Sequence, residues 1–278
     1  MALDINKIKS RFSSLQNQTK KQDSLWKPAA GKSVIRIVPY KFNKDNPFIE
    51  LLFHYGIGGK SYLSPKTFGR PDPIVEFAEG LKKTGSKDDY KLAKTLEPKL
   101  RTYVPVVVRG EEEAGVKFWG FGKTVYLALL DTISDADYGD ITDPVNGRDV
   151  TVEFKTAEET GKNFPSTTIR VKPTPTPLTT SEHVLKAIAE SQKNILDVYK
   201  ELSYDELKVV LADWLNPKNK DGQTATVSAP SDEGLNEGEV VAPSKKATTK
   251  PSAPAPTVAL NMEDINKSFD ELFDQKSN

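Results

Sequence analysis

Basic and aromatic side chains interleave most densely over residues 99–123, where KLRTYVPVVVR is followed by VKFWGFGK. Lysine and arginine neutralise phosphates, and flat aromatic side chains stack on unpaired bases at about 1–3 kcal/mol each. A segment rich in both residue types is therefore suited to a single-stranded polyanion. The candidate phosphate partners are Lys99, Arg101, Lys117 and Lys123, and the candidate stacking residues are Tyr103, Trp119, Phe121 and Tyr126.

The two runs are predicted to form a β-hairpin with strands at 101–109 and 116–121, joined by the turn EEEAG. The proline in the first strand predicts an edge strand or a bulge. The two-residue period of a strand places Lys117, Trp119 and Phe121 on one face, which favours the binding interpretation. The alternative, that half of these aromatic residues are core residues, stays open at this stage.

Other kinds of site chemistry find little support. The chain has no cysteine and two histidines, His54 and His183, which excludes disulfides, thiol catalysis and cysteine-ligated metal. The acidic clusters at 111–113 and 135–143 are expected in solvated loops rather than around metal ions. We therefore predict that the protein is not an enzyme. No run of about 18 apolar residues is present, so no membrane span is expected either.

Charge changes sign along the chain although the formal total is zero. Residues 1–23 carry five basic and two acidic residues (+3), and 24–130 carry eighteen and eleven (+7). Residues 131–216 carry nine and sixteen (−7), and 217–278 carry seven and ten (−3). A basic half predicts a polyanion ligand, and an acidic tail can compete with that ligand or recruit basic partners.

The elements that must position the candidate residues fall within 24–215. Short strands at short intervals, with helices predicted at 73–83, 87–96 and 122–133, favour a small barrel. PTPTP at 173–177 predicts an extended linker, and 181–215 shows the periodicity of two amphipathic helices. The second of these helices follows a predicted capping box, S-Y-D-E, that begins at Ser203.

Both ends of the chain differ from this core. Residues 1–23 are a basic arm with helical apolar spacing, and 216–260 are rich in Pro, Ala, Ser and Thr, which predicts a disordered linker. Residues 261–278 form an acidic amphipathic motif that predicts a docking peptide for other proteins. Its proposed contact residues are Asp264, Phe269, Asp270, Glu271, Leu272, Phe273 and Asp274.

Several short motifs in this order resemble a known family. They are WKPAAGKSVIRIVPY, PFIELLFHYG, GGKSYL, KLRTYVPVVV and KFWGFGK, together with the basic arm and the acidic tail. In order and spacing they resemble the helix-destabilising single-stranded DNA-binding proteins of T-even-type bacteriophages, the products of gene 32. The motifs are individually short, and their collinear order carries the resemblance.

The resemblance implies a mainly β chain with inserted helices: an OB-fold, a five-stranded Greek-key barrel, with a helical and hairpin subdomain at about 60–98. It further implies cooperative coating of single-stranded DNA, head-to-tail self-association, recruitment of phage replication and recombination proteins by the tail, and the cytoplasm of an infected bacterium as the location. The implied DNA-binding set adds Arg36, Lys60, Tyr62 and Phe164 to the residues above. The implied self-association residues are Lys7, Lys9, Ser10, Arg11, Ser13 and Ser14.

One departure from the family is large. The family usually holds a structural zinc with one histidine and three cysteines. His54 matches the histidine, but Lys66, Asp72 and Val75 fall about where the thiolates would be. We therefore expect no zinc and no other cofactor, with Ile74, Phe77 and Leu81 packing the subdomain instead.

Two other functions stay open. A protein-interaction scaffold would use the helices at 181–215 and the terminal acidic peptide, and would not bind oligonucleotides. A metal-dependent nuclease would cleave DNA with magnesium, and has the poorer sequence support.

Overall fold

The computed structural model describes residues 23–199 and 201–215, together with Ile5, Lys9, Phe12 and Phe269. The rest of the predicted arm, the linker 216–260 and the remainder of 261–278 lie outside the described residues. The chain divides into two compact units, each treated by itself. The sheet unit contains the described residues up to Leu51 and those from Leu100 to Glu201, and the helical unit contains Leu52–Lys99, the described residues from Leu202, and Phe269.

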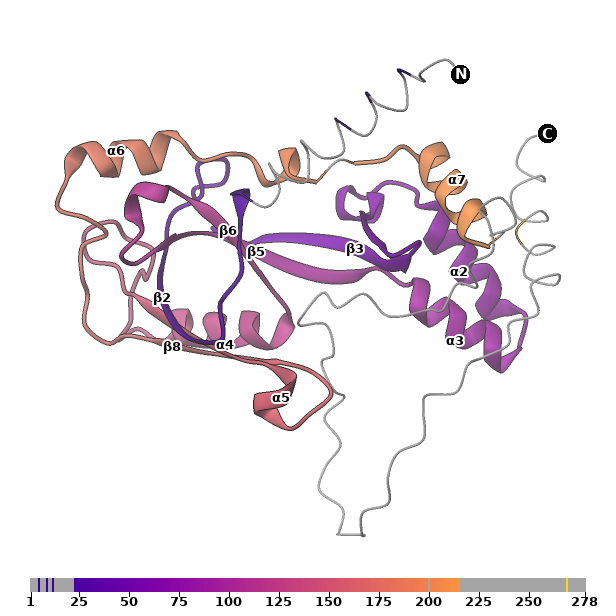
Figure 1. The fold of residues 1–278 in the computed structure, drawn as a ribbon, viewed down its shortest axis with the longest axis horizontal. Helices are drawn as coiled ribbons and strands as arrows, with labels where there is room; N and C mark the ends of the chain where they lie inside the picture. The colour runs from indigo at the N-terminus through magenta and orange to yellow at the C-terminus, as the bar shows by residue number, and fades with distance from the viewer. Residues whose placement is uncertain are drawn as a thin grey trace, which may run out of the picture. The chain divides into compact units, whose positions relative to one another are not determined.

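An eight-stranded mixed sheet runs through the described residues (Figure 1). Its strands follow an open path, with β3 branching from β5 and β4 from β3. β1 and β6 are parallel, whereas β2, β5, β7 and β8 pair antiparallel. The path runs β1 (Leu25–Trp26), β6 (Lys117–Phe121), β5 (Lys99–Val108), β2 (Gly31–Ile37), β7 (Val150–Lys155) and β8 (Ser166–Val171), with β3 at Ile49–Ile57 and β4 at Lys60–Leu63.

Alternating apolar residues build the core of the sheet unit. In β7, Val150, Val152 and Phe154 are buried while the residues between them are partly exposed, which is the period-two pattern of a strand covered on one face. The helix α4 (Lys123–Ser134) packs against β8 (Figure 1) and sends Val125 and Leu129 into the same core. The sheet unit also holds α5 (Ala157–Thr160), α6 (Glu182–Glu190), and the 3₁₀ turns η2 (Glu112–Ala114) and η3 (Ile195–Asp197).

The helical unit begins within β3, contains β4, and continues with the 3₁₀ turn η1 (Pro65–Phe68) and the helices α2 (Pro73–Lys83), α3 (Lys87–Leu96) and α7 (Tyr204–Leu215). The first two helices have the predicted bounds. Asp72 caps α2 by accepting hydrogen bonds from the backbone of Ile74 and Val75. The capping box predicted before α7 is also confirmed, because Ser203 and Glu206 exchange side chain–backbone hydrogen bonds of 3.2 and 2.8 Å.

Two fold predictions are corrected. Helices and strands have similar shares of the described chain, so it is mixed α/β rather than mainly β. Pro105 lies in an inner strand, not at an edge or bulge: it is opposite Phe118 of β6, and its carbonyl accepts the Val38 N–H from the other side. A proline is tolerated there because the hydrogen bond to Val38 uses the proline carbonyl and does not require a backbone N–H. No helix among the described residues is long and apolar enough to cross a membrane.

Candidate nucleic-acid interface

The paired strands β5 and β6 place Arg101 and Tyr103 on one face of the sheet unit, since they are two residues apart. Tyr103 lies opposite Gly120 of β6. A side chain at Gly120 would put its Cβ 2.5 Å from Cε1 of Tyr103, so the tyrosine ring lies across the glycine. Arg101 donates from its guanidinium to the Gly120 carbonyl at 2.8 Å, which holds the cation beside the ring.

A second tyrosine completes this arrangement. Tyr199, which follows η3, has its ring centroid 5.6 Å from that of Tyr103, and the two hydroxyl oxygens are 2.6 Å apart. Tyr103 is only 6% exposed, whereas Tyr199 is half-buried, so Tyr199 is the more exposed ring of the pair. We call Arg101, Tyr103, Gly120 and Tyr199 the tyrosine platform. Sequence reasoning missed Tyr199, for which the only signal was an aromatic residue next to Lys200.

Two predicted stacking residues are corrected, because Trp119 and Phe121 are core residues. Trp119 is 1% exposed, and both pack in the cluster that includes Val125 and Leu129 of α4. The neighbouring Phe118 is also buried, so β6 is covered on both faces and the face argument fails. Tyr126 packs at the edge of that cluster. Burial and a hydrogen bond to Glu50 raise its pKa to about 12.

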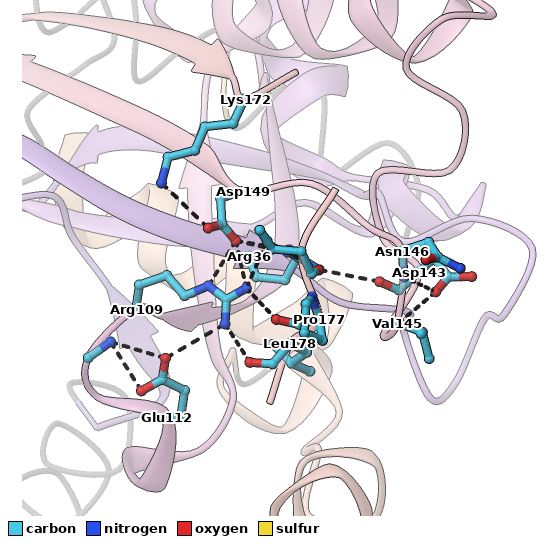
Figure 2. A network of polar contacts seen from close by, with 12 residues as sticks. Arg36, Arg109, Glu112, Asp143, Val145, Asn146, Asp149, Lys172, Pro177 and Leu178 are labelled. Carbon is cyan, nitrogen blue, oxygen red and sulfur yellow. Dashed lines mark hydrogen bonds and ion pairs between the residues drawn. The ribbon is translucent and has the colours of Figure 1, made fainter. Parts of the chain in front are cut away.

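Arg36 is also corrected from a DNA contact to a buried structural residue. Figure 2 shows its guanidinium among polar groups of the sheet unit, with Nε and Nη2 donating to Asp149 at 3.1 and 3.0 Å. Nη2 also donates to the Thr176 carbonyl at 2.7 Å. Arg109 donates to the same Asp149 oxygen at 2.8 Å. Burial alone would raise the pKa of Asp149, but the two arginines outweigh it and hold the pKa below its ordinary value.

The remaining predicted residues are divided between the units. In the sheet unit, Lys123 is exposed at the first turn of α4, and Lys117 is partly exposed at 4.0 Å from Glu111. Phe164 is half-buried, with the ammonium of Lys162 5.8 Å from its ring centroid. In the helical unit, Lys60 and Lys99 are exposed. Tyr62 there packs partly against the apolar core, and burial raises its pKa.

The family model of the gp32 DNA binding protein like family matches residues 29–210, which is most of the chain and includes the whole tyrosine platform. The chain belongs to this gp32-like family of DNA-binding proteins. No curated protein matches it. The family assignment gives the chain a DNA-binding domain, and the platform is a candidate surface for that role in the sheet unit.

Two more aromatic–cation pairs of this gp32-like chain were not predicted. The exposed Phe42 in the β2–β3 loop of the sheet unit has the Lys41 ammonium 5.9 Å from its ring centroid. In the helical unit, the Arg70 guanidinium is 4.9 Å from the ring of Phe68, which is also exposed. Exposed rings beside cations are suited to stacking on bases. The runs KFNK and KTFGR carried this signal in the sequence.

The zinc ion that the resemblance to the T-even-type phage proteins implies does not fit the residues around His54. Nδ1 is 2.7 Å from the Leu96 carbonyl and Nε2 is 2.9 Å from Asp72, and both of these partners are acceptors. Burial alone would raise the pKa of Asp72, but hydrogen bonds from His54 and Ser64 outweigh it and the pKa is lowered. Both ring nitrogens are therefore engaged in buried hydrogen bonds, and neither faces an open position for a metal.

The other ligands that a zinc ion would need are also not gathered. One carboxylate oxygen of Asp72 accepts from His54 and Ser64, and the other caps α2. Among the described residues, no three His, Asp or Glu side chains are grouped so that they could hold a metal ion. Buried hydrogen bonds among Ser64, Asp72, His54 and the Leu96 carbonyl connect β3, η1, α2 and α3.

Proposed function

We propose that this gp32-like protein binds single-stranded DNA with little sequence preference through the tyrosine platform. One observation carries the proposal: Tyr199 and Tyr103 lie together beside the Arg101 guanidinium, in a chain whose family binds DNA. Stacking on tyrosine accepts any base, because every base has a flat face. Arg101 and Lys123 would neutralise nearby phosphates, which makes the affinity sensitive to salt.

The finer assignments follow from the resemblance to the T-even-type phage proteins. We propose an OB-type binding domain, no bound zinc or other cofactor, no enzymatic activity, and a role in phage replication, recombination and repair in the cytoplasm of an infected bacterium. Four residues of the helical unit extend the proposed DNA-binding set: Lys60, Tyr62, Phe68 and Lys99.

The arm is proposed to join neighbouring copies along the DNA. Of its residues the structure describes Ile5, Lys9 and Phe12, which lie four and three positions apart and therefore on one helix face. Ile5 and Phe12 are both exposed, so their apolar side chains are available to a neighbouring copy. The acidic tail is proposed to recruit basic surfaces on replication and recombination proteins.

The test is a titration of the full chain into a fluorescein-labelled oligo-dT, followed by anisotropy at two salt concentrations. A labelled oligonucleotide is preferable to tryptophan emission because Trp119 is buried. Binding that weakens with salt and resists competition by duplex of equal length supports the proposal. An unchanged anisotropy at low salt would refute it and favour the scaffold alternative.

A further inference from the structure

The helical unit contains a residue from the far end of the chain. Phe269 is 9% exposed, and its ring centroid lies 5.9 Å from that of Phe77 in α2, with the planes at 66°. It belongs to the same apolar cluster as Leu207, Leu211 and Leu215 of α7. We call Phe77 and the apolar residues of α2, α3 and α7 around Phe269 the docking face.

The terminal segment is suited to this face by charge as well. Residues 261–278 carry two basic and five acidic residues (−3). In the helical unit, residues 52–99 carry nine basic and six acidic residues (+3), and α7 carries one basic and three acidic residues (−2). Phe12, the described phenylalanine near the other end of the chain, is 66% exposed by contrast. An aromatic anchor within an acidic segment therefore meets an apolar face whose α2 and α3 portion belongs to a basic stretch of the chain.

The chain length permits this contact within one molecule. Fifty-three residues lie between Leu215 and Phe269. A flexible segment of that length has a root-mean-square span of roughly 40 Å. Such a tether gives a local concentration on the order of 1 mM, so even a weakly bound segment is mostly docked.

We propose that the docking face is a site for acidic, aromatic-anchored peptides, and that the chain's own terminal segment occupies it reversibly through Phe269. The following consequence for partner proteins rests on the function proposed above, in which the acidic tail is the segment that binds them. A partner that binds Phe269 must then compete with the docking face, so release of the tail is coupled to partner binding. When the tail is released, the docking face becomes available to another acidic, aromatic-anchored peptide.

The test uses a fluorescein-labelled peptide of residues 261–278 and the full-length protein without DNA. In the wild type the protein's own tail competes, whereas Phe269→Ala leaves the face open. For a docked Kd near 0.1 mM and a local concentration of about 1 mM, the peptide should bind Phe269→Ala roughly ten-fold more tightly than wild type. Phe12→Ala is the matched control, and it should behave as wild type.

A second variant tests the face itself. Phe77→Leu in the Phe269→Ala background keeps most of the side-chain volume, and should weaken peptide binding at least about five-fold while the chain stays folded. Equal affinity for wild type and Phe269→Ala, including no binding to either, would overturn the proposal. So would self-association in sedimentation that Phe269→Ala abolishes, because the occupant would then come from a second copy. Since no DNA is present, failure of docking and failure of DNA binding are separate results.

Discussion

Gly120→Ala offers a way to disturb the tyrosine platform without removing any of the side chains proposed to contact DNA. In Gly120→Ala the new Cβ would lie 2.5 Å from Cε1 of Tyr103, against about 3.5 Å for an ordinary contact, so the ring must move by about 1 Å. The atom it meets is the far end of a side chain, so the ring can move while the strands stay paired. That movement disturbs the hydroxyl contact with Tyr199.

The expected cost follows from the energetics of stacking. One stacked base contributes about 1–3 kcal/mol, and a misplaced ring should lose the lower end of that range, about 1 kcal/mol or five-fold in affinity. The assay is anisotropy of labelled oligo-dT at fixed salt. Tyr103→Phe keeps the ring and removes only its hydroxyl, so it should change the affinity less than Gly120→Ala does.

Gly80→Ala is the matched glycine control. Gly80 lies in α2, and a Cβ added there meets no atom within 4 Å. The substitution should stabilise the helical unit by up to about 1 kcal/mol through helix propensity and leave DNA affinity unchanged. Wild-type affinity in a folded Gly120→Ala protein would refute the reasoning that base stacking depends on the position of the Tyr103 ring.

Other substitutions test the corrected roles. Asp149→Asn leaves the buried Arg36 guanidinium and the partly exposed Arg109 guanidinium without their carboxylate, and should destabilise the protein by about 3 kcal/mol at pH 7, measured by urea unfolding; equal stability would contradict the ion-pair role. Because the folded-state pKa of Asp149 is lowered, its stabilisation is present above the ordinary aspartate pKa of about 4 and is lost as pH falls toward the folded value, so the difference between variant and wild type should shrink below about pH 4. Trp119→Phe should reduce stability by about 1–3 kcal/mol and leave oligo-dT affinity within two-fold, whereas a large loss of affinity with unchanged stability would return Trp119 to the interface. EDTA should not change the thermal unfolding temperature, while Asp72→Ala should lower it; a fall with EDTA would show a structural metal. Arg101→Ala should reduce the slope of log affinity against log salt by about 1, and an unchanged slope would exclude a phosphate contact at Arg101.

The sequence predicted most reliably the elements that depend on local signals. Asp72 caps α2 and Ser203 caps α7, and in both helices apolar residues follow at helical spacing. Both signals lie within about a dozen consecutive residues, so they can be read from the local sequence. The β5–β6 hairpin was likewise visible, because its two strands are joined by a short turn. Membership in the gp32-like family followed from motif order rather than from any single motif.

The burial of individual side chains was not predictable in the same way. The guanidinium of Arg36 donates hydrogen bonds to Asp149, which is 113 positions away, and no residue near Arg36 in the sequence indicates that partner. The face of β6 that looked like a binding surface is covered by α4, so its alternation of Lys and aromatic residues had two interpretations until the helix was placed. Tyr199 and Phe269 were missed because the residues that they contact, Tyr103 and Phe77, are also far away in the sequence.

The most direct test of the central claim is photocrosslinking with an oligo-dT that carries 5-iododeoxyuridine, followed by mapping of the crosslinked peptide. An iodouracil base stacked on an aromatic ring crosslinks to that ring. The account predicts crosslinks at Tyr199, with Tyr103 as a minor site, that disappear in Tyr199→Ala and when unlabelled oligo-dT is added. Crosslinks confined to other residues, with neither tyrosine modified, would show that the tyrosine platform does not bind the DNA bases.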